Sequence, residues 1–242
     1  MTALLAAGVL SAAHLLVGKL LFLDARPTVW KSIAGGIGIS YAFLVLLPKL
    51  ASAQIVLRAA ADGGVYGFLE HHAYLVALAG LSLYYGLDIA AEDVLLRPER
   101  RGWRAVVRLL VVIQAAGFSG YFFLVGYLVG ELPGWSPALL GLSVAMLVHF
   151  VAIDHALRHK YGGLYDRVLR WVFMLTTMAG TLVAKTTEIR FTTLALLNSL
   201  FAGMLIIATM QEKVPNSRHA LFWPFFAGAT SFGVLLALVG LV

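Results

Sequence analysis

Residues 146–161, MLVHFVAIDHALRHKY, place several ionisable side chains in and directly after an apolar run. His149 stands among apolar residues, and Asp154 follows less than two helical turns later. Imidazole and carboxylate groups bind zinc, iron and manganese, and the same groups relay protons inside membranes. The stretch is therefore a candidate metal or proton site, and the alternative is the charged end of a hydrophobic helix.

The helical spacing of these residues limits what they can form together. At about 100° per residue, His149 and Asp154 lie about 140° apart on an ideal helix, so we expect them to face different neighbours. Asp154 and Arg158 are four residues apart, which predicts a salt bridge near the helix end, and His155 and His159 share this spacing. Because a divalent metal needs several converging donors, one helix cannot supply a complete site.

Other polar residues lie in or beside apolar runs elsewhere in the chain. One set would either line a transport pathway or hold helices together: Gln114, Tyr121, Asn198, Gln211 and Glu212. A second set, Glu70, His71 and His72, forms either a cation-capturing cluster at an outer mouth or a polar helix start.

His14 lies inside the first apolar run, and with His149 it would supply two axial haem ligands. We disfavour a haem because the sequence shows no second clear histidine pair.

The composition indicates an integral membrane protein. Of the 242 residues, 61% are hydrophobic and 12% are charged, and the mean hydropathy is +0.89. Soluble proteins contain about 25% charged residues.

The sequence has no cysteine, which excludes a disulfide framework, a thiolate metal site and a thiol nucleophile. It also contains no Ser–His–Asp grouping, phosphate-binding loop or HExxH motif, so we expect no enzyme activity.

The apolar runs predict eight transmembrane helices, because a bilayer core about 30 Å thick calls for about 20 apolar residues per helix. The predicted spans are 3–22, 32–50, 68–90, 106–130, 137–158, 167–185, 191–211 and 220–241. The turns after the first, third, fifth and seventh spans hold 14 of the 18 Lys and Arg residues. The positive-inside rule therefore predicts a cell-membrane protein with these turns in the cytoplasm and both termini outside it. This asymmetry accounts for the net charge of +6 without a nucleic-acid partner.

Four of the spans resemble helices of a known transporter family. The second ends FLVLLPKL (43–50) and the seventh contains FAGMLIIATMQEKVP (201–215), which resemble the second and seventh helices of the ZIP (Zrt/Irt-like) zinc and iron transporters. The stretches HHAYLVALAGLSLYYGLD (71–88) and FMLTTMAGTLVAK (173–185) are similar to that family's third and sixth helices. The resemblance implies a single all-α transmembrane domain over residues 1–242, with helices one to three and six to eight as an inverted repeat around helices four and five.

The metal-binding motifs of the ZIP family are degenerate in this chain. The family's fourth helix carries His-x-x-x-Asp/Glu-Gly, whereas YFFLVG (121–126) has Tyr121 for the histidine and Val125 for the carboxylate. The fifth helix carries His-Glu-x-Pro-x-Glu, and HFVAID (149–154) keeps only His149 and Asp154 as candidate metal ligands. The resemblance thus implies a ZIP-like fold whose binuclear centre is largely lost, and we expect Tyr121 to hydrogen-bond His149 instead.

The resemblance implies a membrane transporter that moves a cation or another small solute, with a divalent metal ion such as zinc as one substrate. The alternative is a non-transporting scaffold or lipid-binding protein that retains the fold. The expected partners are the lipid bilayer, the transported cation or solute, and a second copy of the chain in a homodimer.

Overall fold

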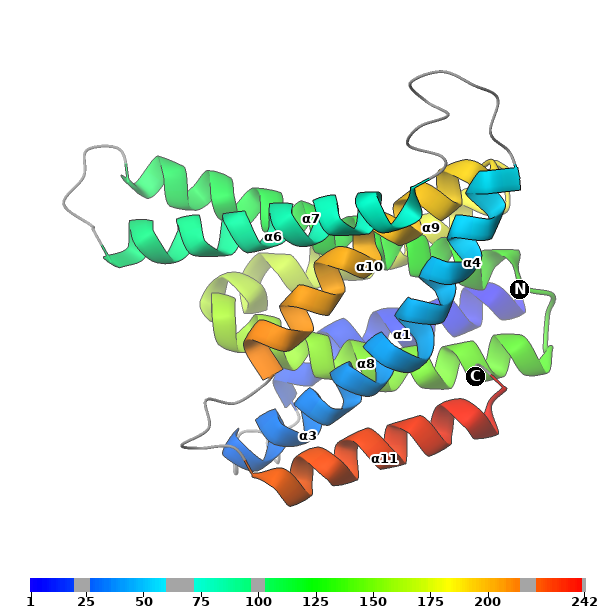
Figure 1. Ribbon diagram of the computed structural model, residues 1–242. Helices are drawn as coiled ribbons and strands as arrows, with labels where there is room; N and C mark the ends of the chain where they lie inside the picture. The colour runs from blue at the N-terminus through cyan, green and yellow to red at the C-terminus, as the bar shows by residue number, and fades with distance from the viewer. Residues whose placement is uncertain (20–26, 60–71, 97–102, 214–220, 241–242) are drawn as a thin grey trace. The chain divides into compact units, whose positions relative to one another are not determined.

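The structure of the protein is a computed structural model that describes residues 1–19, 27–59, 72–96, 103–213 and 221–240. These residues are almost entirely helical and contain no strand (Figure 1). The elements are α1 (Thr2–Leu16), the 3-10 turn η1 (Val17–Lys19), α3 (Pro27–Tyr41), the π turn η2 (Ala42–Leu46), α4 (Leu47–Ala59), α6 (Ala73–Leu96), α7 (Trp103–Glu131), α8 (Pro137–Tyr161), the π turn η3 (Tyr165–Leu169), α9 (Arg170–Val183), α10 (Phe191–Lys213) and α11 (Phe222–Leu238). Because α3, η2 and α4 are continuous and η3 leads directly into α9, the described residues form eight helices.

The all-helical class and the number of helices predicted from the sequence are confirmed for the described residues. Six helical segments are long and apolar enough to cross a membrane: Thr2–Lys19, Thr28–Ala59, Ala73–Ala90, Arg108–Glu131, Pro137–Tyr161 and Phe191–Met210. The largest error in the predicted bounds concerns the second helix, expected over 32–50 and observed over 27–59.

A π turn precedes a proline inside this second helix. Pro48 has no N–H to donate, and in a regular α-helix its ring would clash with the carbonyl of Leu44. In η2 the Leu47 N–H donates to the carbonyl of Ala42, five residues earlier, which widens the helix at this point. The chain can therefore stay helical through Pro48 as far as Ala59.

The contacts between helices divide the chain into two compact units. The first contains Met1–Pro48, Phe122–Ile189 and Thr209–Val242, and the second contains Lys49–Tyr121 and Arg190–Ala208. The long second helix, α7 and α10 each contribute residues to both units.

In the first unit, α1 packs against α8 and α9, and α3 packs against α11 and α8 (Figure 1). The crossing of α3 and α11 depends on two glycines. Gly36 lies against the carbonyl of Phe225, and Gly228 lies against the carbonyl of Ile33, so a Cβ on either glycine would overlap the facing backbone. The absence of side chains at both positions lets the two helices approach closely.

A second close crossing in the first unit joins α7 and α9. Gly126 lies against the backbone of Thr177, and Gly180 lies against the backbone of Phe123. The Thr181 hydroxyl donates to the Gly126 carbonyl across the crossing (2.8 Å). Because Gly126 and Gly180 have no side chains, α7 and α9 approach closely at this crossing.

The second unit contains a third glycine crossing, between α6 and α10. Gly80 lies against the carbonyl of Leu200, and Gly203 lies against the carbonyl of Ala77. Small and aliphatic side chains form the apolar cluster beside it: Leu50, Ala53, Leu57, Ala73, Ala77 and Ala195.

Candidate functional site

Two ionisable side chains, His14 on α1 and Asp154 on α8, meet in the interior of the first unit. His14 Nδ1 and Asp154 Oδ2 are 2.7 Å apart, and both side chains are 0% exposed. An unpaired charge in such a place would cost several kcal/mol. The two residues are 140 positions apart in the sequence, so only the packing of α1 on α8 brings them together.

Small residues on α1 permit this packing. Ala7 and Ala13 are buried, and the Ser11 hydroxyl donates to the carbonyl of Met174 on α9 (3.3 Å). The start of α8 is fixed by Ser136, whose hydroxyl accepts from the Leu139 N–H (3.1 Å).

The second ring nitrogen of His14 also has a polar neighbour. His14 Nε2 lies 3.3 Å from the hydroxyl oxygen of Thr177 on α9. Thr177 has one hydroxyl proton, and its oxygen lies 2.9 Å from the Phe173 carbonyl. In the tautomer in which Thr177 donates to Phe173, this oxygen accepts from His14 and Nε2 carries a hydrogen. One further proton lies between Nδ1 and Oδ2, either as imidazolium with carboxylate or as imidazole with carboxylic acid.

Either location of that proton leaves the pair electrically neutral. If Thr177 instead donated to Nε2, its shorter bond to Phe173 would be lost, and the pair would hold a net negative charge without exposed surface. A neutral pair that holds one exchangeable proton fits this geometry. Loss of this proton would leave a net negative charge on the buried pair, with the imidazole keeping a hydrogen on Nδ1 that donates to the carboxylate.

Aromatic rings enclose His14 on several sides. The Phe122 ring meets it edge-on, with 4.5 Å between ring centroids, and the Phe150 ring lies nearly parallel at 5.1 Å. The Phe173 ring is 6.0 Å away. These apolar neighbours increase the cost of separating charge at the pair.

Tyr165, the first residue of η3, is a further polar neighbour. Its hydroxyl donates to the His14 carbonyl (3.3 Å). Asp154 Oδ1 receives no hydrogen bond of ordinary geometry within the described part of the chain. A buried carboxylate oxygen without such a donor weakens the fold, and a functional role is one explanation for its presence.

His149 faces another side of α8. Its ring stacks on Tyr41 of α3, with 3.8 Å between centroids, and the Tyr41 hydroxyl donates to the sulfur of Met146 (3.9 Å). His149 and Asp154 therefore contact different helices, as their spacing predicts. Tyr121 belongs to the second unit, and its hydrogen bond to His149 stays a prediction.

The predicted salt bridge between Asp154 and Arg158 is wrong. Asp154 is paired with His14, and Arg158 Nε donates to Asp166 Oδ1 at 3.0 Å. Asp154 is wholly buried beside the imidazole of the facing helix, whereas Arg158 lies one turn nearer the helix end and reaches a partly exposed carboxylate.

The donors in this region do not fit a binuclear metal centre or a haem. His149 and Asp154 point to different neighbours, and the described residues contain no group of three or more His, Cys, Asp or Glu side chains able to hold a metal ion. The rings of His155 and His159 are adjacent, 4.6 Å between centroids, but both come from α8. Both ring nitrogens of His14 are already engaged, which leaves neither for a haem iron.

The remaining pathway candidates lie on α7 and α10. Gln114 Nε2 donates to Asp88 Oδ1 at 3.4 Å and borders an apolar cavity of about 80 Å³ in the second unit. Asn198 is half-buried. Gln211 and Glu212 are in α10, but their side chains lie outside the described part.

Only one member of the expected outer-mouth cluster is described. Glu70 and His71 lie outside the described residues, whereas His72 directly precedes α6. The His72 carbonyl accepts from the N–H groups of Leu75 and Val76, which suits the start of a helix.

The sequence matches no protein-family model and no curated protein. Sequence reasoning singled out His14 and Asp154 separately but missed their pairing. The sequence did contain a signal for the pairing. His14 and Asp154 are each an isolated ionisable residue in an apolar helix, and such residues in a bilayer need partners on other helices.

Proposed function

We propose that the protein is a membrane transporter with a ZIP-like inverted repeat, in which the His14–Asp154 pair carries a proton that is exchanged during transport of a cation or small solute. The observation that carries this proposal is the fully buried His14–Asp154 pair, 2.7 Å apart, between two apolar helices. Ionisable residues inside a membrane bundle usually belong to ion pathways or proton relays.

The sequence supports the repeat in its second and seventh helices. A constant offset of 167 residues relates Ser32 to Ser199, Gly36 to Gly203 and Pro48 to Pro215. In the third and eighth helices a constant offset of 148 residues relates His71 to His219, Ala79 to Ala227, Gly80 to Gly228 and Tyr84 to Phe232. These helices are corresponding members of the two triplets in the proposed repeat.

The glycine contacts support the same correspondence. Gly36 meets the carbonyl of Phe225, while its counterpart Gly203 meets the carbonyl of Ala77, the counterpart of Phe225. The reverse contacts also correspond. Gly228 lies against the carbonyl of Ile33, and its counterpart Gly80 lies against the carbonyl of Leu200. Leu200 is the counterpart of Ile33 under the offset of 167 residues. One crossing is in the first unit and the other in the second, so equivalent crossings occur twice in the chain.

The proton site belongs to one half of the repeat only. The stretch SAAHLLVGK (11–19) aligns with TMAGTLVAK (177–185), which makes Gly180 the counterpart of His14. Likewise, YFFLVG (121–126) aligns with HFVAID (149–154), which makes Gly126 the counterpart of Asp154. Gly126 and Gly180 belong to the tight crossing of α7 and α9. The ionisable pair therefore replaces glycines at the equivalent places of the other half.

The chemistry of the pair suits an alternating-access cycle. With the proton bound, His14 and Asp154 stay together and carry no net charge into the apolar interior. When the proton leaves, the pair holds a net negative charge without exposed surface, which favours a conformation in which water reaches it. The bound cation or solute would change sides in the same cycle, since inverted repeats move about a fixed central site.

The test uses purified protein in liposomes that contain a pH-sensitive dye. A gradient of zinc, manganese or sodium ions is applied, and the proton flux is compared with that of empty liposomes. With the natural chain we expect proton flux, and with His14→Gln or Asp154→Asn we expect only the flux of empty liposomes. The control is Glu131→Gln, an exposed carboxylate at the end of α7, which should leave the flux unchanged. Helical circular dichroism checks that each variant folds.

The alternative function is a membrane scaffold. It draws on the observation that His149 and Asp154, two of the expected pathway residues, contact different helices instead of one shared cavity. If the natural chain moves neither protons nor any tested cation, the scaffold is the better description.

A further inference from the structure

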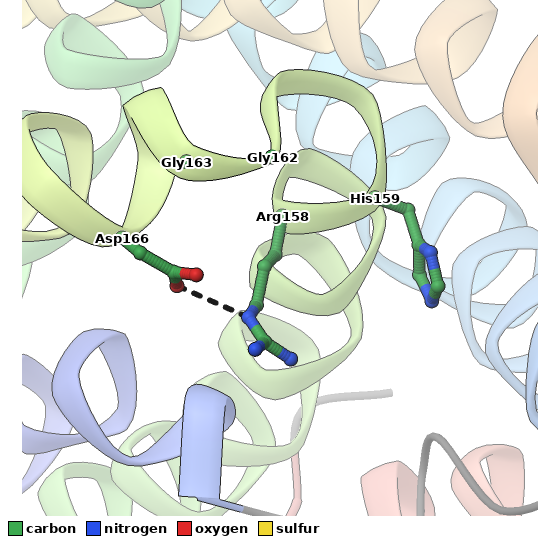
Figure 2. A pocket seen from close by; sticks show the side chains of 5 residues that line it. All are labelled: Arg158, His159, Gly162, Gly163 and Asp166. Carbon is green, nitrogen blue, oxygen red and sulfur yellow. Dashed lines mark hydrogen bonds and ion pairs between the residues drawn. The ribbon is translucent and has the colours of Figure 1, made fainter.

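A partly open cavity of about 190 Å³ lies where α8 ends and η3 begins. Its lining consists of two glycines and three polar residues: Arg158, His159, Gly162, Gly163 and Asp166. Figure 2 shows the Arg158 and Asp166 side chains pointing toward one another, while His159 points away from them. The distribution of basic residues predicts that this turn is cytoplasmic.

The ion pair between Arg158 and Asp166 joins the ends of three elements. The Arg158 and Asp166 side chains are 26% and 41% exposed, and their interacting atoms are 3.0 Å apart. Gly18 in η1 packs against them, because a Cβ at this glycine would lie 3.7 Å from both Arg158 Nε and Asp166 Oδ1. The pair therefore lines the cavity beside the end of the helix that carries His14.

Tyr165 connects this ion pair to the proton site. It is fully buried and precedes Asp166 in the chain. Its hydroxyl donates to the carbonyl of His14 (3.3 Å), and the next residue, Asp166, lines the cavity. Adjacent residues of η3 thus contact the cavity and the helix that carries His14.

We propose that the cavity is the mouth through which protons reach the His14–Asp154 pair, and that the Arg158–Asp166 ion pair is the gate of this mouth. The inference rests on the proposed function. When the gate is open, water enters from the cavity, and a hydronium ion gives one proton to the deprotonated His14–Asp154 pair and becomes water. One proton has then moved inward.

The glycines beside the gate provide a hinge. Gly162 ends α8 with φ +53° and ψ −127°, a conformation that side-chain-bearing residues rarely adopt, and its N–H donates to the Arg158 carbonyl (2.8 Å). Gly163 follows directly. Two consecutive glycines allow η3 to move relative to α8 once the ion pair breaks.

Cysteine labelling tests the gate, because the chain has no cysteine of its own. The reporter is Val17→Cys, a 1% exposed position next to Gly18, and Ala3→Cys, 3% exposed near the other end of the same helical segment, is the matched control. Both are treated with a small charged thiol reagent in lipid nanodiscs, where both membrane faces are accessible. Removing a partly exposed ion pair with Asp166→Asn should raise the labelling rate at Val17→Cys by about two- to fivefold.

The labelling rate at Ala3→Cys should stay unchanged, and exchanging the charges with Arg158→Asp and Asp166→Arg should restore slow labelling at Val17→Cys. An unchanged rate at Val17→Cys, or an equal rise at Ala3→Cys, would overturn the gate. Labelling needs no ion gradient, so the two proposals can fail separately. A normal labelling response without proton flux would count against the proposed function, whereas normal flux without a labelling response would count against the gate.

Discussion

The energetic coupling between His14 and Asp154 is the most direct measure of the site. Replacing one partner leaves the other buried without it, which costs about 3–5 kcal/mol for a buried charged pair. Replacing both removes the ionisable groups together, so the double variant should lose less stability than the sum of the two single variants. We expect a coupling free energy of about 2–4 kcal/mol, because ordinary hydrogen bonds between membrane helices average about 0.6 kcal/mol and reach about 1.7 kcal/mol.

The measurement is a double-mutant cycle with His14→Leu, Asp154→Ala and the combined variant. Leucine fills much of the space between Phe122 and Phe150, and alanine adds no polar group. The free energy of unfolding is measured by titrating the protein in detergent micelles with sodium dodecyl sulfate and following helical circular dichroism.

A second cycle with Tyr41→Ala and His149→Ala provides the control. The two rings stack at 3.8 Å, and such contacts are worth about 0.5–1.5 kcal/mol. A coupling energy for His14 and Asp154 no larger than that of this stacked pair would refute the assignment of a shared, buried proton.

Three further predictions concern packing, topology and metal binding. Gly36→Ala should destabilise the protein by about 1–3 kcal/mol, because its Cβ would overlap the Phe225 carbonyl; Gly8→Ala, where a Cβ meets nothing within 4 Å, should stabilise it by up to about 1 kcal/mol, and chemical unfolding compares the two. In intact cells an impermeant thiol reagent should label Glu188→Cys but not Leu164→Cys, and the reverse pattern would overturn the predicted orientation. Calorimetry should detect no sub-micromolar zinc binding; such binding, if lost in His149→Ala, would show that a working metal site remains.

Composition and periodicity were enough to predict the helices, because each apolar run is an independent, local signal. The glycine crossings were also partly predictable, since small residues such as Gly126 mark places where helices approach closely. The partner of Asp154 was not predictable in this way. Its local spacing favoured Arg158, which lies on the same helix, whereas His14 lies 140 residues away and becomes adjacent only when α1 packs on α8.

The π turn η2 changes how the second helix responds to a shorter chain. Tyr41, before the turn, stacks on His149 of α8, whereas Leu50 and Leu57, after it, belong to the apolar cluster with residues of α6 and α10. Deleting one residue from a regular α-helix rotates all later side chains by about 100°. A π turn holds one residue more than an α turn, so deleting one residue within Ala42–Leu46 would convert it into an α turn and keep Leu50 and Leu57 on the same faces. This five-residue stretch is therefore a place where the helix loses one residue without changing which face meets its neighbours, and the cost falls on Pro48, whose ring would then meet the carbonyl four residues before it.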